Sequence, residues 1–164
     1  MNPVPPDWLN RLPELVGPVS LDVAGYTVEI SLAAPELEYV YLPTLACLDR
    51  LARSSRVLAG LAGVPGSGKS TFAAALARLA DRLLGHAALV PVGIDGWHLP
   101  NAVLDRRTTT DESGRPVPLS RRKGSPASFD APALAAALRR LAHARVAVRL
   151  PAYDRNRHDP VPDA

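Results

Sequence analysis

One stretch near the middle of the chain, residues 63–70, limits what the sequence can fold into more than any other. It reads Gly-Val-Pro-Gly-Ser-Gly-Lys-Ser and matches the spacing G-x-x-x-x-G-K-S/T. Residues 56–62 before it read as a short buried strand, and residues 69–84 after it carry apolar side chains at helical spacing. The sequence therefore predicts a strand, a glycine-rich loop and a helix in direct succession.

This spacing is the Walker A pattern, or P-loop, in which main-chain N–H groups surround the phosphates of a nucleotide. Glycines leave room for that close approach and permit positive φ, and the start of a helix favours negative charge. We expect ATP and Mg²⁺ as cofactors. The residues expected to bind them are Gly63, Pro65, Gly66, Ser67, Gly68, Lys69, Ser70 and Thr71. Lys69 is predicted to reach the β- and γ-phosphates as a catalytic residue, and Ser70 to ligate the metal. The alternative is a glycine-rich turn that only caps a helix.

Two further apolar runs read as buried strands, at residues 87–94 and 145–150. Residues 131–143 read as a helix that Asp130 caps. Strands that alternate with helices after a glycine loop predict a three-layer α/β/α P-loop NTPase fold with a mostly parallel sheet.

Residues 1–55 are expected to form an N-terminal extension packed on this core. Their pattern predicts a helix at residues 7–16, a β-hairpin at residues 19–32 and a helix at residues 37–53. Pro43 should kink or divide the last helix, because proline lacks the N–H group that a helix interior needs.

Polar residues follow two of the predicted strands at their carboxyl ends, where parallel α/β sheets bind ligands. Asp95 ends the second strand, and Tyr153 and Arg155 follow the third. We expect these residues to share one cleft with the glycine loop. Asp95 suits two roles, a ligand of Mg²⁺ or a base that accepts the proton of a substrate hydroxyl, and its position does not separate them. For His98, a structural or exposed role is favoured over catalysis.

Composition argues against several other classes of protein. The 164 residues are 47% hydrophobic, enough for a folded core, and carry a formal charge of +3. Arginine clusters without a recognition module or interleaved aromatic residues argue against nucleic acid as a partner. A single cysteine, Cys47, excludes an internal disulfide, and the four histidines lack zinc-ligand spacing. No apolar run approaches the ~20 residues of a membrane span and no signal peptide is recognisable, so a cytoplasmic protein without a membrane partner is expected.

Several motifs follow the glycine loop in a recognisable order. They are residues 95–101 (Asp-Gly-Trp-His-Leu-Pro-Asn), 122–130 (Arg-Lys-Gly-Ser-Pro-Ala-Ser-Phe-Asp), 151–155 (Pro-Ala-Tyr-Asp-Arg) and 158–159 (His-Asp). Together with the loop they resemble the phosphoribulokinase, uridine kinase and pantothenate kinase superfamily, nearest to its nucleoside/nucleotide kinase-like branch. The resemblance covers about residues 56–160, and residues 56–164 are therefore assigned to a partial P-loop kinase domain.

The resemblance implies an ATP-dependent small-molecule kinase that transfers the γ-phosphate to a hydroxyl of a nucleoside, a pantothenate-like or a sugar-like metabolite. It implies that Asp95 activates this hydroxyl. The residues expected to bind the acceptor are Asp95, Lys123, Tyr153 and Arg155. Arg155 stands where pantothenate kinases carry a histidine that contacts the acceptor, a change that suits an acidic or phosphorylated acceptor.

The related kinases continue past the point that matches Ala164 with a second acidic Mg²⁺ ligand and an arginine-bearing lid. We therefore expect a core that is incomplete at its C-terminus: a truncated product, a sheet that a partner completes, or a homologue without activity. The alternative function is accordingly a catalytically incomplete ATP-binding module. Uncovered sheet edges would favour self-association, so a homo-oligomer is also expected.

Overall fold

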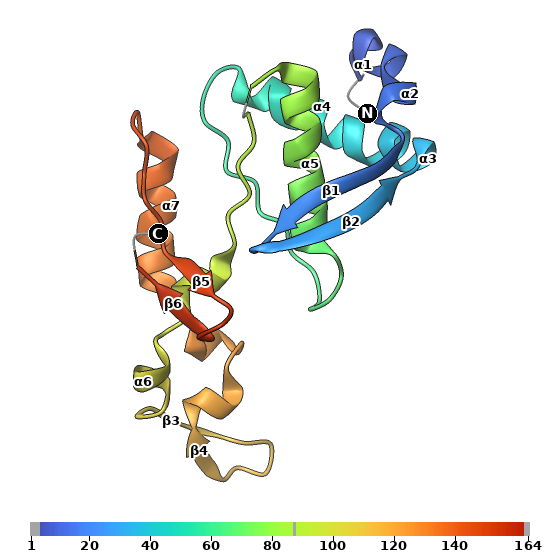
Figure 1. The fold of residues 1–164 in the computed structure, drawn as a ribbon. Coiled ribbons are helices and arrows are strands. Elements are labelled where there is room, and N and C mark those ends of the chain that lie inside the picture. Colours follow the sequence, from blue (N-terminus) through green and yellow to red (C-terminus); the bar gives the residue numbers. More distant parts are fainter. Residues whose placement is uncertain (1–3, 87, 163–164) are drawn as a thin grey trace. The chain divides into compact units, whose positions relative to one another are not determined.

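The computed structural model describes residues 4–86 and 88–162. The chain divides into two units, Met1–Val92 and Gly93–Ala164 (Figure 1). The boundary expected after residue 55 concerns the kinase-like segment and stays a prediction. Among the described residues, no helix combines the length and the apolar character that crossing a bilayer requires.

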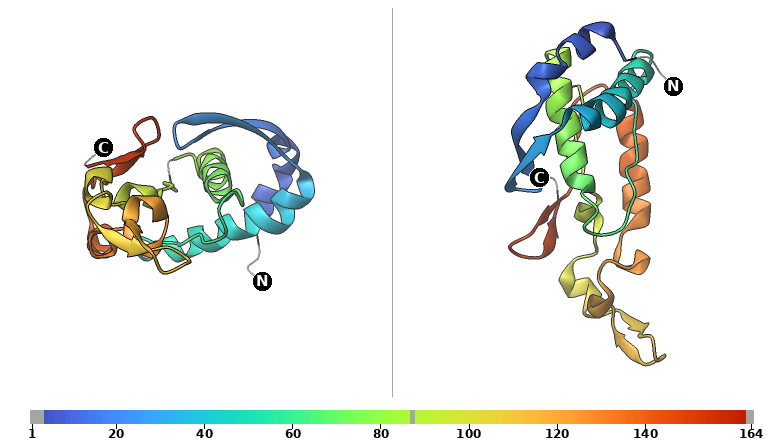
Figure 2. Two further views of the ribbon diagram at one scale, coloured as in Figure 1. Left: turned by 90° about the horizontal axis from the view of Figure 1, so that it is seen from below. Right: turned by 90° about the vertical axis from the view of Figure 1, so that its right-hand side faces the viewer.

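The first unit combines a β-hairpin with helices. Its elements are α1 (Pro6–Asn10), α2 (Leu12–Leu15), β1 (Gly17–Val23), β2 (Tyr26–Leu32), α3 (Ala34–Glu36), the π-helical turn η1 (Leu37–Tyr41), α4 (Leu42–Ala52) and α5 (Lys69–Leu84). Helix α5 packs on β1, and seen end-on it lies between the β1–β2 hairpin and the α3–α4 segment (Figure 2). The helix expected at residues 7–16 forms as the two short helices α1 and α2.

The β1–β2 hairpin is confirmed, and its turn shows why the sequence specifies it. Val23 pairs with Tyr26, so the turn contains only Ala24 and Gly25. Both turn residues have positive φ, 55° and 84°, the conformation that matches the twist of a two-residue hairpin. The Gly25 N–H group also donates to Asp22 Oδ1 at 2.9 Å, which satisfies a donor that the turn would otherwise leave without a partner.

The interruption expected at Pro43 is also confirmed. The π-helical turn η1 ends at Tyr41, just before the proline. Pro43 has no N–H group to donate back along the helix, and the Thr44 hydroxyl donates to the Val40 carbonyl at 2.6 Å in the same turn. The π-helical turn therefore lets the chain pass through Pro43, in the first turn of α4, and helix α4 continues to Ala52.

Helix α5 carries the core of the first unit. Leu79 on its inner face is 1% exposed and belongs to one cluster with buried residues of the hairpin, of the other helices and of α5 itself. Those residues are Trp8, Leu15, Leu32, Leu37, Leu42, Leu45, Ala46, Leu76 and Ala80. The predicted helix boundaries are confirmed: α5 ends at Leu84, and Gly85 follows with φ 74° and donates its N–H group to the Asp81 carbonyl.

The three-layer α/β/α P-loop NTPase fold with a mostly parallel sheet is wrong for this structure. All sheets among the described residues are antiparallel pairs, β1–β2, β3–β4 and β5–β6. Residues 56–62, 88–93 and 145–150 form no strand, and the start of the second predicted strand, residue 87, lies outside the described residues. Val90 and Val146, in two of these segments, are 74% and 76% exposed. An apolar run indicates a preference for burial, but a strand forms only where another strand pairs with its backbone.

The second unit consists of short elements and one longer helix. They are the 3-10 turn η2 (Ile94–Trp97), α6 (Asn101–Leu104), β3 (Thr108–Thr110), β4 (Pro116–Pro118), the 3-10 turns η3 (Leu119–Arg122) and η4 (Pro126–Ser128), α7 (Ala131–His143), β5 (Ala152–Asp154) and β6 (Asp159–Val161). Helix α7 is confirmed at its predicted bounds, with Asp130 Oδ1 accepting the Ala133 N–H group at 2.9 Å.

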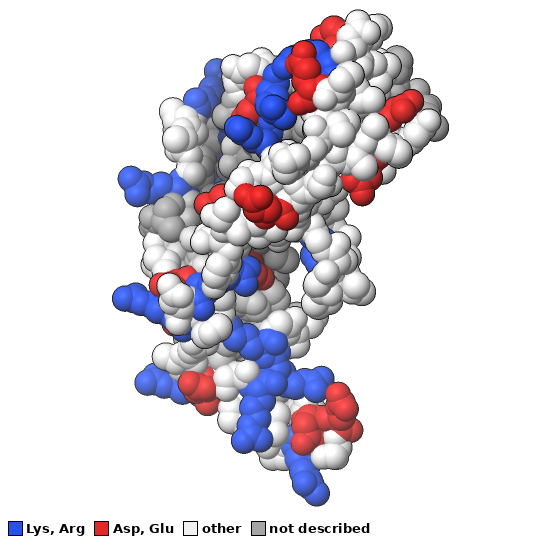
Figure 3. Space-filling view, turned by 45° about the vertical axis from the view of Figure 1, so that its right-hand side comes forward, with Lys and Arg blue, Asp and Glu red and all other residues white. Residues whose placement is uncertain are grey.

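The β3–β4 hairpin carries prolines at both ends of its second strand. The Leu119 N–H group donates across the hairpin to the Arg107 carbonyl at 2.8 Å. Successive backbone N–H groups point to opposite edges of a strand, so the ring nitrogens of Pro116 and Pro118 lie on the edge that faces away from β3. Lys and Arg side chains gather at the end of the unit that holds this hairpin (Figure 3).

Candidate functional site

The glycine-rich loop in the first unit has the backbone conformation expected from its sequence. Gly66 and Gly68 have φ of 77° and 80°, values that side-chain-bearing residues rarely adopt. Gly68 is the N-cap of α5, and its carbonyl accepts the Phe72 N–H group at 2.8 Å. Residues 63–68 are exposed, so the start of this 16-residue helix is open to solutes. A helix N-terminus with nearby glycines favours an anion.

The Lys69 side chain folds back over this loop. Its Nζ atom donates to the Val64 carbonyl at 2.8 Å, five residues earlier in the chain. The Ser67 N–H group donates to the same carbonyl at 3.2 Å. A Cβ atom at Gly63 would lie 3.0 Å from Ser67 Oγ, so glycine is the residue that fits there without displacing the serine. The loop thus closes on itself with a cationic group over it, next to the exposed Ser70 and the half-buried Thr71.

In the second unit, Gly96 explains the position of Asp95. A Cβ atom at Gly96 would overlap the Pro151 carbonyl oxygen, so only glycine permits η2 to pack this closely on the segment leading into β5. That contact brings Asp95 beside the residues that follow Pro151. Asp95 lies in a 3-10 turn and not at the end of a strand. Its neighbours therefore follow from a backbone contact, and not from the edge of a parallel sheet.

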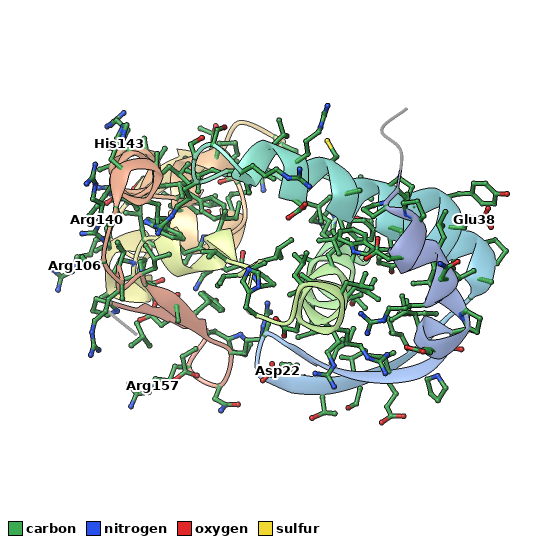
Figure 4. All side chains as sticks on the ribbon, turned by 90° about the horizontal axis from the view of Figure 1, so that it is seen from above. Asp22, Glu38, Arg106, Arg140, His143 and Arg157 are labelled. Carbon is green, nitrogen blue, oxygen red and sulfur yellow. The ribbon has the colours of Figure 1, made fainter. Side chains whose placement is uncertain are left out.

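Asp95 has two nitrogen-bearing neighbours. Arg155 Nη2 lies 3.4 Å from Asp95 Oδ2, and His98 Nε2 lies 3.9 Å from Asp95 Oδ1. The Asp95 and Arg155 side chains are 45% and 41% exposed, so a solute can reach both. Arg157, in the same turn as Arg155, points outward and pairs with Asp154 at 3.7 Å (Figure 4).

His98 packs among aromatic side chains, with little of its own side chain exposed. Its side chain is 8% exposed and its ring stacks on Phe129, with the ring centroids 3.9 Å apart. The Tyr153 ring packs against it in an edge-type arrangement, with 5.7 Å between the ring centroids. The two aromatic neighbours fix the imidazole beside the carboxylate of Asp95.

Lys123 also lies near the Tyr153 ring. Its Nζ atom is 5.2 Å from the centroid of the Tyr153 ring and donates to Asn101 Oδ1 at 2.6 Å. It also donates to the His158 carbonyl. Asn101 in turn donates its backbone N–H group to Asp159 Oδ1 at 2.8 Å. Sequence reasoning gave no role to Asn101 or Asp159, although both lie within the ordered motifs and could have been found there.

The second unit thus brings together all four residues predicted to bind the acceptor, Asp95, Lys123, Tyr153 and Arg155. The residues predicted to bind the nucleotide lie in the first unit, around the start of α5. Ser70 and Asp95, the predicted metal ligands, belong to different units, and their joint site stays a prediction. Among the described residues, no group of three or more His, Cys, Asp or Glu side chains is placed to hold a metal.

Comparison with known proteins finds relatives among kinases. The chain is 30% identical to a pantothenate kinase of Rhizobium meliloti (strain 1021), over 96% of this chain and 46% of the kinase. It is 34% identical to a pantothenate kinase of Bradyrhizobium sp. (strain ORS 278), over 80% of this chain and 37% of the kinase. A protein of Escherichia coli (strain K12) named uncharacterized protein YggC is 32% identical, over 89% of this chain and 58% of that protein.

These matches relate the chain to pantothenate kinases over most of its length, and the chain spans about half the length of these relatives. No family model matches the sequence. No solved structure matches it either. The assignment to one superfamily and the incompleteness at the C-terminus stay predictions.

Proposed function

We propose that this protein is an ATP-dependent kinase that phosphorylates a hydroxyl group of a small acidic metabolite. The observation that carries the proposal is the contact between Asp95 and Arg155, which sets a carboxylate and a guanidinium side by side where solutes can reach both. A carboxylate can accept the proton of a hydroxyl, and a guanidinium can bind an acid group of the same acceptor. Relatives named pantothenate kinase support this class of reaction.

In the proposed reaction the loop at residues 63–71 holds the phosphates of ATP. The Lys69 ammonium, now bonded to the Val64 carbonyl, would bind the β- and γ-phosphate oxygens, and the Ser70 hydroxyl would hold Mg²⁺ to neutralise the charge on these phosphates. Asp95 accepts the proton of the acceptor's hydroxyl, and the hydroxyl oxygen attacks the γ-phosphorus. The bond from that phosphorus to the bridging oxygen breaks, and ADP leaves with the electron pair.

The acceptor class follows from Arg155. A guanidinium binds carboxylate or phosphate with two parallel hydrogen bonds, so it favours an anionic acceptor over a neutral nucleoside or sugar. A pantothenate-like hydroxy acid fits both groups, because it carries a hydroxyl for Asp95 and a carboxylate for Arg155.

The same ion pair favours a second candidate, an ATP-binding module without phosphoryl transfer. The guanidinium of Arg155 lies 3.4 Å from Asp95 Oδ2, and while this contact persists that oxygen is engaged and does not accept a proton from a hydroxyl. In an active kinase, Arg155 must turn from Asp95 to the acceptor when the acceptor binds.

The test is ADP release from Mg-ATP in the presence of pantothenate, glycerate, uridine or ribose, together with nucleotide binding measured by thermal shift. We expect turnover with an acidic acceptor, loss of nucleotide binding in Lys69→Ala, and intact nucleotide binding without turnover in Asp95→Asn. Full turnover in Asp95→Asn would contradict the role of this residue as a base. Binding of Mg-ATP with no turnover on any acceptor supports the second candidate, and unchanged melting of both parent and Lys69→Ala with ATP contradicts both.

A further inference from the structure

We infer that Lys123 is a positioning residue, which fixes the turn that carries Arg155 and does not itself bind the acceptor. This inference rests on the proposed function for its kinetic consequence, but its structural part concerns the free protein. The group consists of Lys123, Asn101, His158 and Asp159 and is called the lysine clamp below.

Two hydrogen bonds of the Lys123 ammonium lie within the clamp. An ammonium has three N–H donors, and two of them point to Asn101 Oδ1 and to the His158 carbonyl. The Tyr153 ring lies 5.2 Å from the same nitrogen, a distance at which a cation and an aromatic face attract each other. Lys123 is half-buried, so these partners replace much of its water.

Asn101 completes the clamp by bonding to both of the other segments that meet there. Its backbone N–H group donates to Asp159 Oδ1 at 2.8 Å, and its side-chain amide donates to the His158 carbonyl at 3.0 Å. Its side-chain oxygen accepts from Lys123 at 2.6 Å. These bonds connect the first residue of α6, the residue after η3 and the beginning of β6.

His158 shows that the clamp does more than fill space. Its φ is 51°, in the left-handed region that residues with a side chain adopt uncommonly. Such a conformation persists where surrounding contacts fix it. The His158 carbonyl accepts from both Lys123 and Asn101, so the clamp holds the strained residue itself.

The strained residue ends the turn in which Arg155 lies. Residues 155–158 connect β5 to β6, and Asp154 opposite Asp159 closes the hairpin. Asp154 Oδ1 accepts the N–H groups of Asn156 and Arg157 at 2.8 and 3.1 Å. With one end of the turn fixed by this carboxylate and the other by the clamp, the Arg155 side chain is directed to Asp95.

Amide hydrogen exchange on the full chain without ligand tests the structural part. We expect exchange in residues 153–160 to become about tenfold faster in Lys123→Met, because the loss of a charged hydrogen bond raises the open population of the turn. Lys123→Arg should stay near the parent, since it still donates to the same acceptors. Arg121→Met is the matched control, because it removes an exposed positive charge two residues away, outside the clamp.

Exchange in helix α7 reports whether the second unit remains folded in each variant. If Lys123→Met also loses protection there, Asn101→Ala replaces it, with the same expected acceleration limited to residues 153–160. Parental exchange rates in this turn for Lys123→Met, or for Asn101→Ala where it is needed, would overturn the inference.

A double-mutant cycle on kcat/KM tests the kinetic part once turnover is measured. If Lys123 acts through the clamp, Lys123→Met should have a much smaller effect in the Asn101→Ala background than in the parent. Equal losses in both backgrounds would show that Lys123 binds the acceptor directly. Failure of the proposed function would remove turnover in the parent, yet leave the exchange result to decide the structural part.

Discussion

Arg155 Nη2 lies 3.4 Å from Asp95 Oδ2, across sixty residues of sequence. Both side chains are more than 40% exposed, so water screens the attraction, and such pairs contribute little to folding stability. The pair therefore bears on the proposed role of Asp95 more than on the stability of the fold.

Replacing Arg155 by methionine separates these two effects. We expect the free energy of unfolding to change by less than about 0.5 kcal/mol, as is usual for an exposed position. The KM for an acidic acceptor should rise about tenfold or more, because a charged hydrogen bond to the acceptor is lost. Denaturant titration and steady-state kinetics measure the two quantities. Arg155→Lys is the control, and an unchanged KM in Arg155→Met would contradict the binding of the acid group by Arg155.

Gly68→Ala tests the backbone of the nucleotide loop. The added methyl group has open space, but φ of 80° is unfavourable for alanine by roughly 1 kcal/mol. We expect destabilisation of this size in denaturant titration, together with weaker nucleotide binding in a thermal-shift assay. Gly93→Ala is the matched control, because that glycine also has open space but a φ of −78° that alanine readily adopts. Equal stability of the two variants would contradict the strained conformation.

Asp130→Ala should destabilise the protein by about 1 kcal/mol, because the Ala133 N–H group at the start of α7 loses its acceptor. Asp130→Asn keeps an oxygen at the same place and should recover most of this loss. Urea titration followed by circular dichroism measures both. A neutral Asp130→Ala would show that the cap does not stabilise α7.

The carboxyl of Asp111 gives a prediction about pH. The Ser113 hydroxyl bonded to it at 2.7 Å, and then the Arg115 N–H group, lower its pKa below the usual value. A group whose pKa is lower in the folded state stabilises the fold above its unfolded pKa, about 3.9, and this contribution disappears as the pH falls through the folded value. The stability difference between the parent and Asp111→Ala should therefore shrink below about pH 4. Thermal melts between pH 2 and 6 measure it, and a constant difference across this range would contradict the pKa shift.

Leu79→Ala should destabilise the first unit by about 2–5 kcal/mol, because it leaves a cavity in the cluster around α5. Leu51→Ala in α4 is the control, since Leu51 is 48% exposed and its truncation leaves no buried space. Urea titration of both variants decides between core packing and a general effect of losing leucine.

The elements that the sequence predicts well are those whose signals are local. The Ala24-Gly25 turn, the Asp130 cap and the terminal Gly85 each act within a few residues, and the structure shows the hairpin and helices they indicate. The three apolar runs failed as strand signals, because a strand depends on a partner elsewhere in the chain and the runs do not specify one.

In the candidate site, too, the sequence indicates which residues lie together but not the distant contact that brings them there. Asp95, Tyr153 and Arg155 were expected to meet at the edge of a parallel sheet, and within the second unit they do lie together. The cause, however, is the close contact of Gly96 with the Pro151 carbonyl, which no periodic pattern reveals. The clamp escaped prediction for a similar reason, because its bonds reach the backbone carbonyl of His158, a residue whose positive φ no periodic pattern reveals.

The two prolines of β4 have a consequence for how copies of this chain meet. On its outer edge, the strand offers no N–H group at Pro116 or at Pro118, and an incoming strand would find acceptors there without donors. An edge of this kind resists growth by strand addition, the step that begins fibrillar aggregation. The outer edge of the β3–β4 hairpin therefore disfavours pairing with the same edge of another copy of the chain.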